Sequence, residues 1–182
     1  MKKLFLAFCI LFSLSAQATD ENSLWLFRGR VVLNGSQFSD YKSNGAFQIS
    51  QVTKNLEGGY INEASLDGVK RDGLYLMYRI PFSLTDRLKS VVAGGLYGTS
   101  TTIEALDKTD YTYQYGVTLM SSLGLEYRIT HDLYVQTRYQ HQFLSSDKRD
   151  TDMFMAGLGY SFPPKTRAQK YEEAKRLLED DQ

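Results

Sequence analysis

The sequence predicts an all-β protein, an eight-stranded, antiparallel, up-and-down transmembrane β-barrel, and three observations predict it. Long segments alternate apolar and polar residues with a period of two, an export signal precedes them, and the connections between them alternate in character. Because a strand places successive side chains on opposite sides, this alternation predicts strands with one apolar face.

The clearest alternation lies between residues 113 and 162. From Tyr113 to Ile129 the residues at odd positions are mostly apolar, whereas those between them are small or polar. Strands of ten or more residues are long for a soluble sheet, and they have the length that a tilted strand needs to cross a bilayer. The predicted strands comprise residues 24–33, 46–52, 58–64, 74–80, 87–99, 113–129, 133–143 and 153–162.

The amino terminus has the pattern of a secretory signal peptide, in residues 1–18. Lys2 and Lys3 form a basic region, an apolar stretch follows, and Ala16-Gln17-Ala18 has the small residues of a cleavage site. The single cysteine, Cys9, lies inside this segment, so we expect no disulfide in the exported chain. Without the two lysines the formal charge is about −2, which gives no basic surface for nucleic acid.

The predicted connections are of two kinds. Those after the fourth and sixth strands are short, whereas four others are polar or charged, at residues 34–45, 65–72, 100–112 and 145–151. Outer-membrane barrels have short periplasmic turns, longer external loops and an even number of strands. Proline occurs only at positions 81, 163 and 164, which we place outside the strand interiors. We therefore expect residues 19–162 to form one barrel domain.

Alternation alone does not say which face lines the interior, because a soluble lipocalin-like barrel would show the same period. Aromatic residues near the strand ends, Trp25 among them, favour an apolar face turned to lipid. The opposite face of the same strands, rich in Gly, Ser, Gln and Arg, suits a narrow, filled lumen. The facing of residues 87–99 stays open.

We expect a network of charged and amide side chains in this lumen. Because buried charges must be paired, a hydrogen-bonded plug explains such a network better than an ion path does. The predicted members are Arg28, Arg30, Arg79, Glu126, Arg128, Gln136, Arg138 and Gln140.

Residues 154–162, FMAGLGYSF, resemble the terminal strand of the OmpA/OmpX-type small outer-membrane barrels. In that family a final Phe, with an aromatic residue two positions earlier, is read by the barrel-assembly machinery. The segment LGLEYR at 123–128 and the turn at 130–132 are also similar to the family's strand–turn–strand repeats. The resemblance covers about residues 22–162 and implies that Tyr160 and Phe162 form the assembly signal, here followed by further chain.

The resemblance implies a place in the outer membrane of a Gram-negative bacterium, among outer-membrane lipid and lipopolysaccharide. It implies external loops that meet host or other cell-surface ligands, with adhesion, serum resistance or envelope integrity as roles. We expect no enzymatic activity, catalytic residue, cofactor or metal. Residues 163–182 follow two prolines and contain Thr166-x-x-Gln169, which is similar to a capping box and predicts a short periplasmic helix.

Two alternatives stay open. Outer-membrane lipid A deacylases resemble this design and use an outward His-x-Ser pair with a carboxylate. Here the sequence reads His141-Gln142-Phe143, so the hydroxyl is absent, and Ser145 is a poor substitute. The first alternative is a lipid A-modifying enzyme centred on His141, and the second is a secreted soluble lipocalin-like barrel that binds an apolar ligand.

Overall fold

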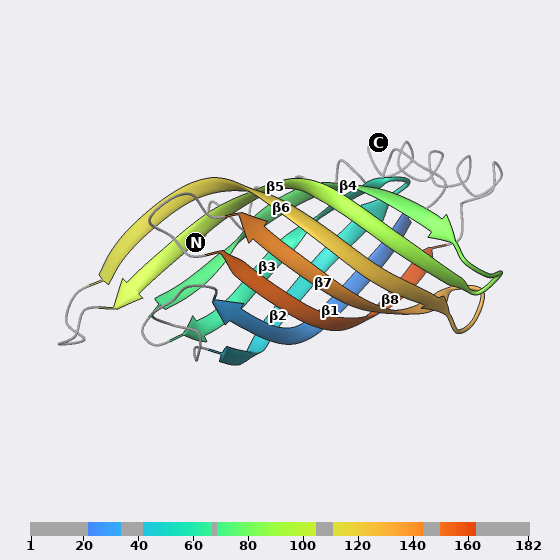
Figure 1. Cartoon of the computed structure of the whole chain (residues 1–182), viewed down its shortest axis with the longest axis horizontal. Helices are drawn as coiled ribbons and strands as arrows, with labels where there is room; N and C mark the ends of the chain where they lie inside the picture. Colours follow the sequence, from blue (N-terminus) through green and yellow to red (C-terminus); the bar gives the residue numbers. More distant parts are fainter. Residues whose placement is uncertain (1–21, 34–41, 67–68, 105–110, 144–149, 163–182) are drawn as a thin grey trace, which may run out of the picture.

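The structure, a computed structural model, describes residues 22–33, 42–66, 69–104, 111–143 and 150–162. Here the chain forms a closed barrel in which each strand pairs antiparallel with the next and β1 pairs with β8 (Figure 1). The predicted fold class is confirmed for this part of the chain. The strands are β1 (Asn22–Leu33), β2 (Lys42–Thr53), β3 (Leu56–Leu66), β4 (Val69–Ser83), β5 (Leu88–Glu104), β6 (Tyr111–Arg128), β7 (Leu133–Phe143) and β8 (Thr151–Phe162).

Two predictions lie outside the described residues, namely the signal peptide at 1–18 and the periplasmic helix at 163–182. Across the part of the chain that the structure does describe, no helix has the length and apolar character needed to cross a membrane.

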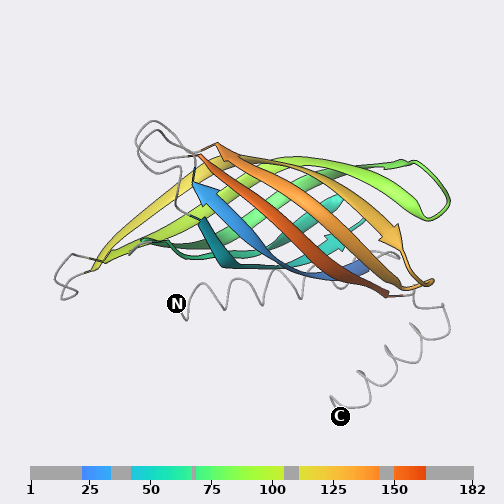
Figure 2. The same cartoon turned by 60° about the horizontal axis from the view of Figure 1, so that its bottom comes forward.

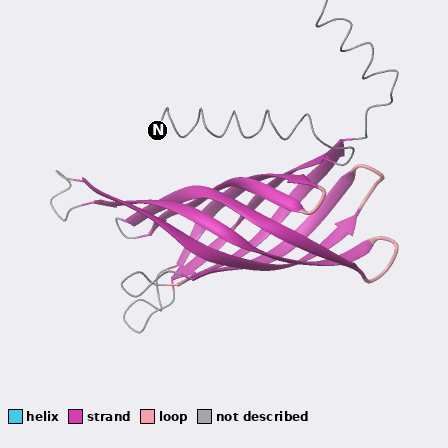
Figure 3. Cartoon of the chain, turned by 90° about the horizontal axis from the view of Figure 1, so that it is seen from above, coloured by secondary structure: helices cyan, strands magenta, loops and turns pink. Residues whose placement is uncertain are grey.

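One end of the barrel carries three short connections, residues 54–55, 84–87 and 129–132, and is called the short-turn end below (Figure 3). Side-chain hydroxyls close two of these turns. The backbone N–H of Leu88 donates to Thr85 Oγ1 at 3.0 Å, and that of Leu133 donates to Thr130 Oγ1 at 3.1 Å. The opposite end, where β1, β3, β5 and β7 finish, is called the loop end.

The longest strands, β5 with 17 residues and β6 with 18, form a hairpin that reaches past the other strands at the loop end (Figures 1 and 2). Their register continues without a break to Glu104 opposite Tyr111. The predicted loop at 100–112 was therefore wrong over most of its length. The segments on either side of residues 105–110 are rich in threonine and tyrosine, which favour the extended strand conformation.

Pro81 also lies inside a strand, β4, which corrects the expectation that it lies outside the strand interiors. Pro81 is opposite Val91 of β5, three residues before β4 reaches the turn. The N–H of Arg79 points to the β3 side, where it donates to Asn55 O at 2.6 Å. The nitrogen of Pro81 faces the same side, beyond the last β3–β4 pair at Leu56 and Tyr78, so no ladder hydrogen bond is lost.

The outer face of the barrel is largely apolar. The apolar faces of β4, β6, β7 and β8 point outward, as predicted, and β5 turns Val92 and Leu96 outward with Tyr97 inward. Exposed fractions of 53 to 57% are typical of this face, as at Leu26, Leu76, Leu96, Leu123 and Leu158.

The large aromatic side chains of the interior lie over inward-facing glycines of neighbouring strands. Trp25 is opposite Gly159, and a Cβ atom added to that glycine would lie 2.5 Å from the indole ring. Such a cross-strand pair of a large residue and a glycine fits a narrow lumen, because the missing side chain leaves the space that the ring fills. The same arrangement joins Phe27 to Gly157 and Tyr75 to Gly59. The ring of Tyr97 lies over Gly73, which is its diagonal rather than its direct neighbour on β4.

The glycine beneath the indole ring gives the first prediction. Gly159→Ala is expected to lower the free energy of unfolding by about 1–3 kcal/mol, since the new methyl group must displace a rigid ring. Gly94→Ala is the matched control, because the nearest atom to its added Cβ is 3.9 Å away. Urea unfolding in lipid vesicles, followed by circular dichroism, measures both. Equal stability of the two variants would contradict this packing.

Candidate functional site

The carboxylate of Glu57 on β3 lies at the centre of a charge cluster in the barrel interior and is fully buried. Arg138 on β7 binds it with both terminal nitrogens, at 2.5 and 2.9 Å. Arg79 on β4 approaches the same carboxylate with Nε at 3.3 Å, and the hydroxyl of Tyr75 donates to it at 2.7 Å. This geometry compensates one buried carboxylate with two guanidinium groups.

The same two arginines connect the cluster to its surroundings. Arg79 Nη2 donates to Glu126 on β6 at 2.9 Å, which extends the network toward the short-turn end. The guanidinium carbon of Arg79 lies 5.8 Å from the centre of the Trp25 ring, and that of Arg138 lies 4.4 Å from the Phe27 ring. At these distances the aromatic faces stabilise the cations. The inward aromatics of β1 therefore belong to the same network.

A second cluster lies nearer the loop end. Arg71 on β4 forms an ion pair with Glu63 on β3 at 3.4 Å, and its Nη1 donates to Thr151 Oγ1 at 2.9 Å. The hydroxyl of Tyr97 donates to Glu63 at 3.1 Å. The cluster joins β3, β4, β5 and β8 across the interior.

The buried charges of the described chain balance. Three arginines and three glutamates are buried, and each makes an ion pair with a member of the other set. Methionine and isoleucine side chains fill the space beside these clusters, and they include Ile61, Met77, Met120, Met153 and Met155. A pocket of about 760 Å³ opens at the short-turn end, and its lining includes Trp25, Arg79 and Glu126.

Five predicted members of the lumen network lie inside the barrel. Arg79, Glu126 and Arg138 form the ion pairs above, and Gln136 Oε1 accepts a hydrogen bond from Arg138 Nη2 at 3.0 Å. Gln140 is fully buried, and neither of its amide atoms has a hydrogen-bond partner among the residues that the structure describes.

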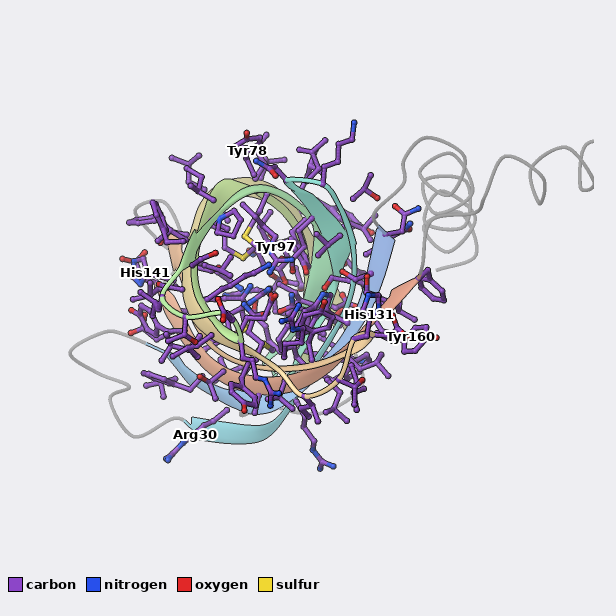
Figure 4. The ribbon with its side chains drawn as sticks, turned by 90° about the vertical axis from the view of Figure 1, so that its right-hand side faces the viewer. Arg30, Tyr78, Tyr97, His131, His141 and Tyr160 are labelled. Atoms are coloured by element: carbon purple, nitrogen blue, oxygen red, sulfur yellow. The ribbon has the colours of Figure 1, made fainter. Side chains whose placement is uncertain are left out.

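Arg28 and Arg30 lie elsewhere: both are exposed on the outer face of β1, so their assignment to the lumen was wrong. Figure 4 shows Arg30 outside the barrel wall. Trp25 on the same strand was also assigned to the wrong face. We expected it to face outward, and its side chain is 2% exposed. The alternation in a sequence is compatible with either face of a strand pointing inward. If the assignment shifts by one residue, every side chain expected inside lies outside, and the reverse. In β1 the inward face is set by the glycines of β8, which accept the aromatic rings.

Arg128 lies at the mouth of the barrel rather than among the buried ion pairs. Its side chain is exposed at the short-turn end, where Nη2 donates to the backbone oxygen of Asp86 at 2.9 Å.

Two central members of the network, Glu57 and Arg71, were missed by the sequence analysis. Arg71 falls in the predicted loop at 65–72, and Glu57 directly precedes the predicted third strand. Their positions carry a signal nevertheless. Glu57 shares the parity of Ile61 and Glu63, so an extension of the third strand by one inward position would have included it.

His141 on β7 lies on the outer face, as its position in the alternation predicts (Figure 4). Its Nδ1 lies 2.7 Å from Asp152 on β8, and its Nε2 lies 3.7 Å from Asp150. The hydroxyl of Tyr139 donates to the same oxygen of Asp152 at 2.6 Å. Ser121 is directly opposite His141 in the β6–β7 register.

His131, in the β6–β7 turn, is exposed and lies 2.7 Å from Asp132. Among the described residues no group of three or more His, Cys, Asp or Glu side chains has a metal-binding arrangement. Tyr160 and Phe162 lie on the outer face at the end of β8, with ring centres 5.2 Å apart in an edge-to-face contact.

The central ion pairs give the second prediction. Glu57→Gln is expected to lower the free energy of unfolding by about 3–5 kcal/mol, because it leaves two buried guanidinium groups without their shared carboxylate. The removal of an exposed charge at the rim, Arg128→Gln, is the control and should change stability little. Urea unfolding in lipid vesicles compares the two. A Glu57→Gln protein as stable as its parent would show that the cluster does not hold the strands together.

Comparison with known proteins gives structural but not sequence matches. No family model and no curated protein matches this sequence. The solved structure of Neisserial surface protein A matches 78% of this chain and 96% of its own, with a TM-score of 0.61 and 13% identity. Ail, the attachment invasion locus protein of Yersinia pestis, matches 80% of this chain and 100% of its own, with a TM-score of 0.55 and 12% identity.

The N-terminal β-barrel domain of OprF from Pseudomonas aeruginosa matches 80% of this chain and 100% of its own, with a TM-score of 0.52 and 16% identity. At such identities the likeness concerns the fold alone. The chain has the closed, eight-stranded, antiparallel fold of the small outer-membrane β-barrels.

Proposed function

We propose that this protein is a non-enzymatic outer-membrane β-barrel of a Gram-negative bacterium, with a plugged lumen and an external surface that serves adhesion or envelope integrity. The observation that carries the proposal is the distribution of polarity. Ion-paired glutamates and arginines fill the interior, whereas leucine and aromatic side chains cover much of the outside. This distribution is typical of a barrel whose outer wall meets acyl chains.

The same distribution argues against a secreted lipocalin-like barrel. Such a barrel would need an apolar interior for its ligand and a polar outer wall for water. Here β6 alone exposes Leu119, Leu123 and Leu125 to the outside, at 49 to 61%. An apolar surface of this extent in water would favour aggregation, whereas in a membrane the same surface contacts acyl chains.

The unequal ends support an orientation. Outer-membrane barrels place short turns in the periplasm and long connections outside the cell. The short-turn end with its connections of two and four residues would therefore face the periplasm. The loop end and the β5–β6 hairpin would face outward, among lipopolysaccharide and any host or cell-surface ligands.

The β5–β6 hairpin offers the clearest contact surface. Tyr113, Tyr115 and Val117 are 61, 74 and 75% exposed on one face of β6, and Thr112 and Gln114 are exposed on the other. Exposure of both faces shows that this part of β6 stands clear of the barrel interior. Tyrosine combines a rigid apolar ring with a hydroxyl, which makes it a frequent anchor in protein interfaces. The name of Ail describes an attachment protein of the same fold.

The plugged interior supports a structural rather than a transport role. An eight-stranded barrel leaves room inside for little more than its own side chains. The Glu57 and Glu63 clusters cross this space from β3 to β7 and from β3 to β8 respectively, through hydrogen bonds that an ion path would have to break.

Tyr160 and Phe162 support the proposed link to the barrel-assembly machinery. Both rings stand on the outer face of the closing strand, 47 and 49% exposed, where another protein can contact them.

One observation favours the alternative of a lipid A-modifying enzyme. Asp152 holds the Nδ1 atom of His141, as the acid of a catalytic triad holds its histidine, and Ser121 is the cross-strand neighbour. However, the nearest carboxylate to Nε2 is Asp150, and a serine nucleophile must be within hydrogen-bond reach of that nitrogen. Among the residues that the structure describes, no serine hydroxyl donates to that nitrogen, so the contacts with Asp152 and Asp150 position the histidine without a nucleophile in place.

Cysteine labelling tests the proposed display. Because Cys9 lies in the predicted signal peptide, a cysteine at position 112 should be the only thiol of the exported chain. Thr112→Cys is expected to react with a membrane-impermeant maleimide in intact cells, whereas the control Asp86→Cys should react only after permeabilisation. Coupling a bulky polyethylene glycol maleimide to position 112 should then reduce adherence of the cells to host-cell monolayers. The opposite labelling order would overturn the orientation, and unchanged adherence would remove the hairpin from the contact surface.

Substitution of His141 distinguishes the proposed non-enzymatic barrel from a lipid A-modifying enzyme. If the protein is not an enzyme, His141→Ala leaves the acylation pattern of lipid A unchanged in mass spectra of cells that express it. Ser121→Ala should behave in the same way. A pattern that differs between cells with and without the parent protein, and that either variant abolishes, would establish the enzyme instead.

A further inference from the structure

Arg28 and Arg30 form a pair of basic side chains on the outer wall of the barrel. Both are exposed, and Figure 4 shows Arg30 directed away from the interior. Since they are two residues apart on one strand, their Cα atoms lie about 6.6 Å apart along β1. Their neighbours in the register are Ala156 and Phe154 of β8.

The pair lies where the outer wall changes from apolar to polar. Arg30 is in the row of Phe154 and Tyr139, whose rings are 5.2 Å apart and partly exposed. The next outward row toward the loop end contains Asp152 and His141. In a membrane, such a change marks the level of the lipid headgroups, where an arginine can extend its guanidinium group to the interface.

A groove runs over the wall beside the arginines. It crosses from β1 to β6, and Arg28 and Arg30 form one side of it. The small outward residues Ala156 and Thr137 lie between them and the leucines of β6. The lining of the groove includes Arg28, Arg30, Thr137, Ala156, Leu123 and Leu125.

No described carboxylate lies within ion-pair distance of either arginine. The nearest outward acid in the register, Asp152, already contacts Tyr139 and His141. An arginine on the lipid-facing wall is costly when it has no counter-charge, and the cost rises with depth. A negatively charged group of the membrane itself is therefore the complementary partner.

We propose that Arg28 and Arg30 bind the phosphate of a phosphorylated glycolipid of the outer leaflet, lipid A, while one of its acyl chains lies in the groove over Ala156 and Thr137. Arginine suits this task because its planar fork binds phosphate oxygens in pairs. The choice of lipid A over a phospholipid rests on the proposed orientation, since the loop end then faces the leaflet that holds lipopolysaccharide.

The test measures lipid retention by the purified full-length protein. The protein is reconstituted in phosphatidylcholine nanodiscs that contain bisphosphorylated lipid A, dephosphorylated lipid A or phosphatidylglycerol, and the bound lipid is counted by native mass spectrometry. We expect bisphosphorylated lipid A to be retained most strongly. Its apparent affinity should fall about tenfold in R28Q/R30Q, since two charge-assisted contacts are removed.

Two variants control for charge and for folding. Lys70→Gln removes an exposed basic residue near the same end of the barrel but on β4, and Arg87→Gln removes one at the short-turn end. Both should retain lipid A as the parent does, and a gel-mobility shift on boiling shows that each barrel has folded. The comparison of bisphosphorylated with dephosphorylated lipid A uses the parent protein alone. It therefore tests the phosphate contact even if R28Q/R30Q does not fold.

Three outcomes would overturn the inference. They are equal retention of bisphosphorylated and dephosphorylated lipid A, equal retention of phosphatidylglycerol, and an equal loss in Lys70→Gln. Cysteine labelling at positions 112 and 86 reports the orientation separately. A correctly oriented barrel that shows any of these outcomes lacks the lipid site alone, whereas a reversed labelling order removes the proposed function as well.

Discussion

The pairing of Glu57 with Arg138 and Arg79 is the interaction on which the interior of this barrel depends. Glu57 and Arg138 lie 81 residues apart in the chain, and their ion pair joins β3 to β7 through the centre of the lumen. A charge in so confined a space is stable only when an opposite charge and good hydrogen-bond geometry accompany it. Balanced charges therefore allow buried polar groups inside the barrel, and the ion pairs join strands that face each other across it.

Glycine complements this charge balance. The aromatic rings that cover Arg79 and Arg138 need space that an eight-stranded lumen offers only where the opposite strand lacks a side chain. Gly157 and Gly159 provide it for Phe27 and Trp25. Each guanidinium group thus packs on a ring, and each ring packs on a glycine, so that each group limits the conformation of the next.

Much of the fold could be predicted from the sequence because a period of two is a strong signal in long strands. The seventh strand was predicted at its observed bounds, Leu133–Phe143, since a regular alternation starts after the turn at 130–132 and continues to Phe143. The outward face of β6 followed from the same pattern. Where β-branched and polar residues mix, as in β5 and the start of β4, the pattern gave shorter strands than the chain forms.

The errors in the facing of β1 share one physical cause. Trp25 and Phe27 look like lipid-facing aromatics and Arg28 and Arg30 look like lumen charges, if each residue is judged by polarity alone. The deciding factor is the shape of the partner strand, because only the glycines of β8 at this register leave room for two large rings. Such a factor involves residues more than a hundred positions away, so local alternation does not contain it. The same applies to Glu57, whose partners come from β4 and β7.

The β5–β6 hairpin has a consequence for the kinetics of the recognition that we propose for it. Its backbone hydrogen bonds continue in register to Glu104 and Tyr111, so its conformation is set before any partner arrives. A flexible loop loses conformational entropy when it binds, whereas a preformed ribbon loses little. Contacts made by its tyrosines should therefore form at rates close to those of rigid-body docking, and sequence drift at the tip should alter partner choice without altering the frame that presents it.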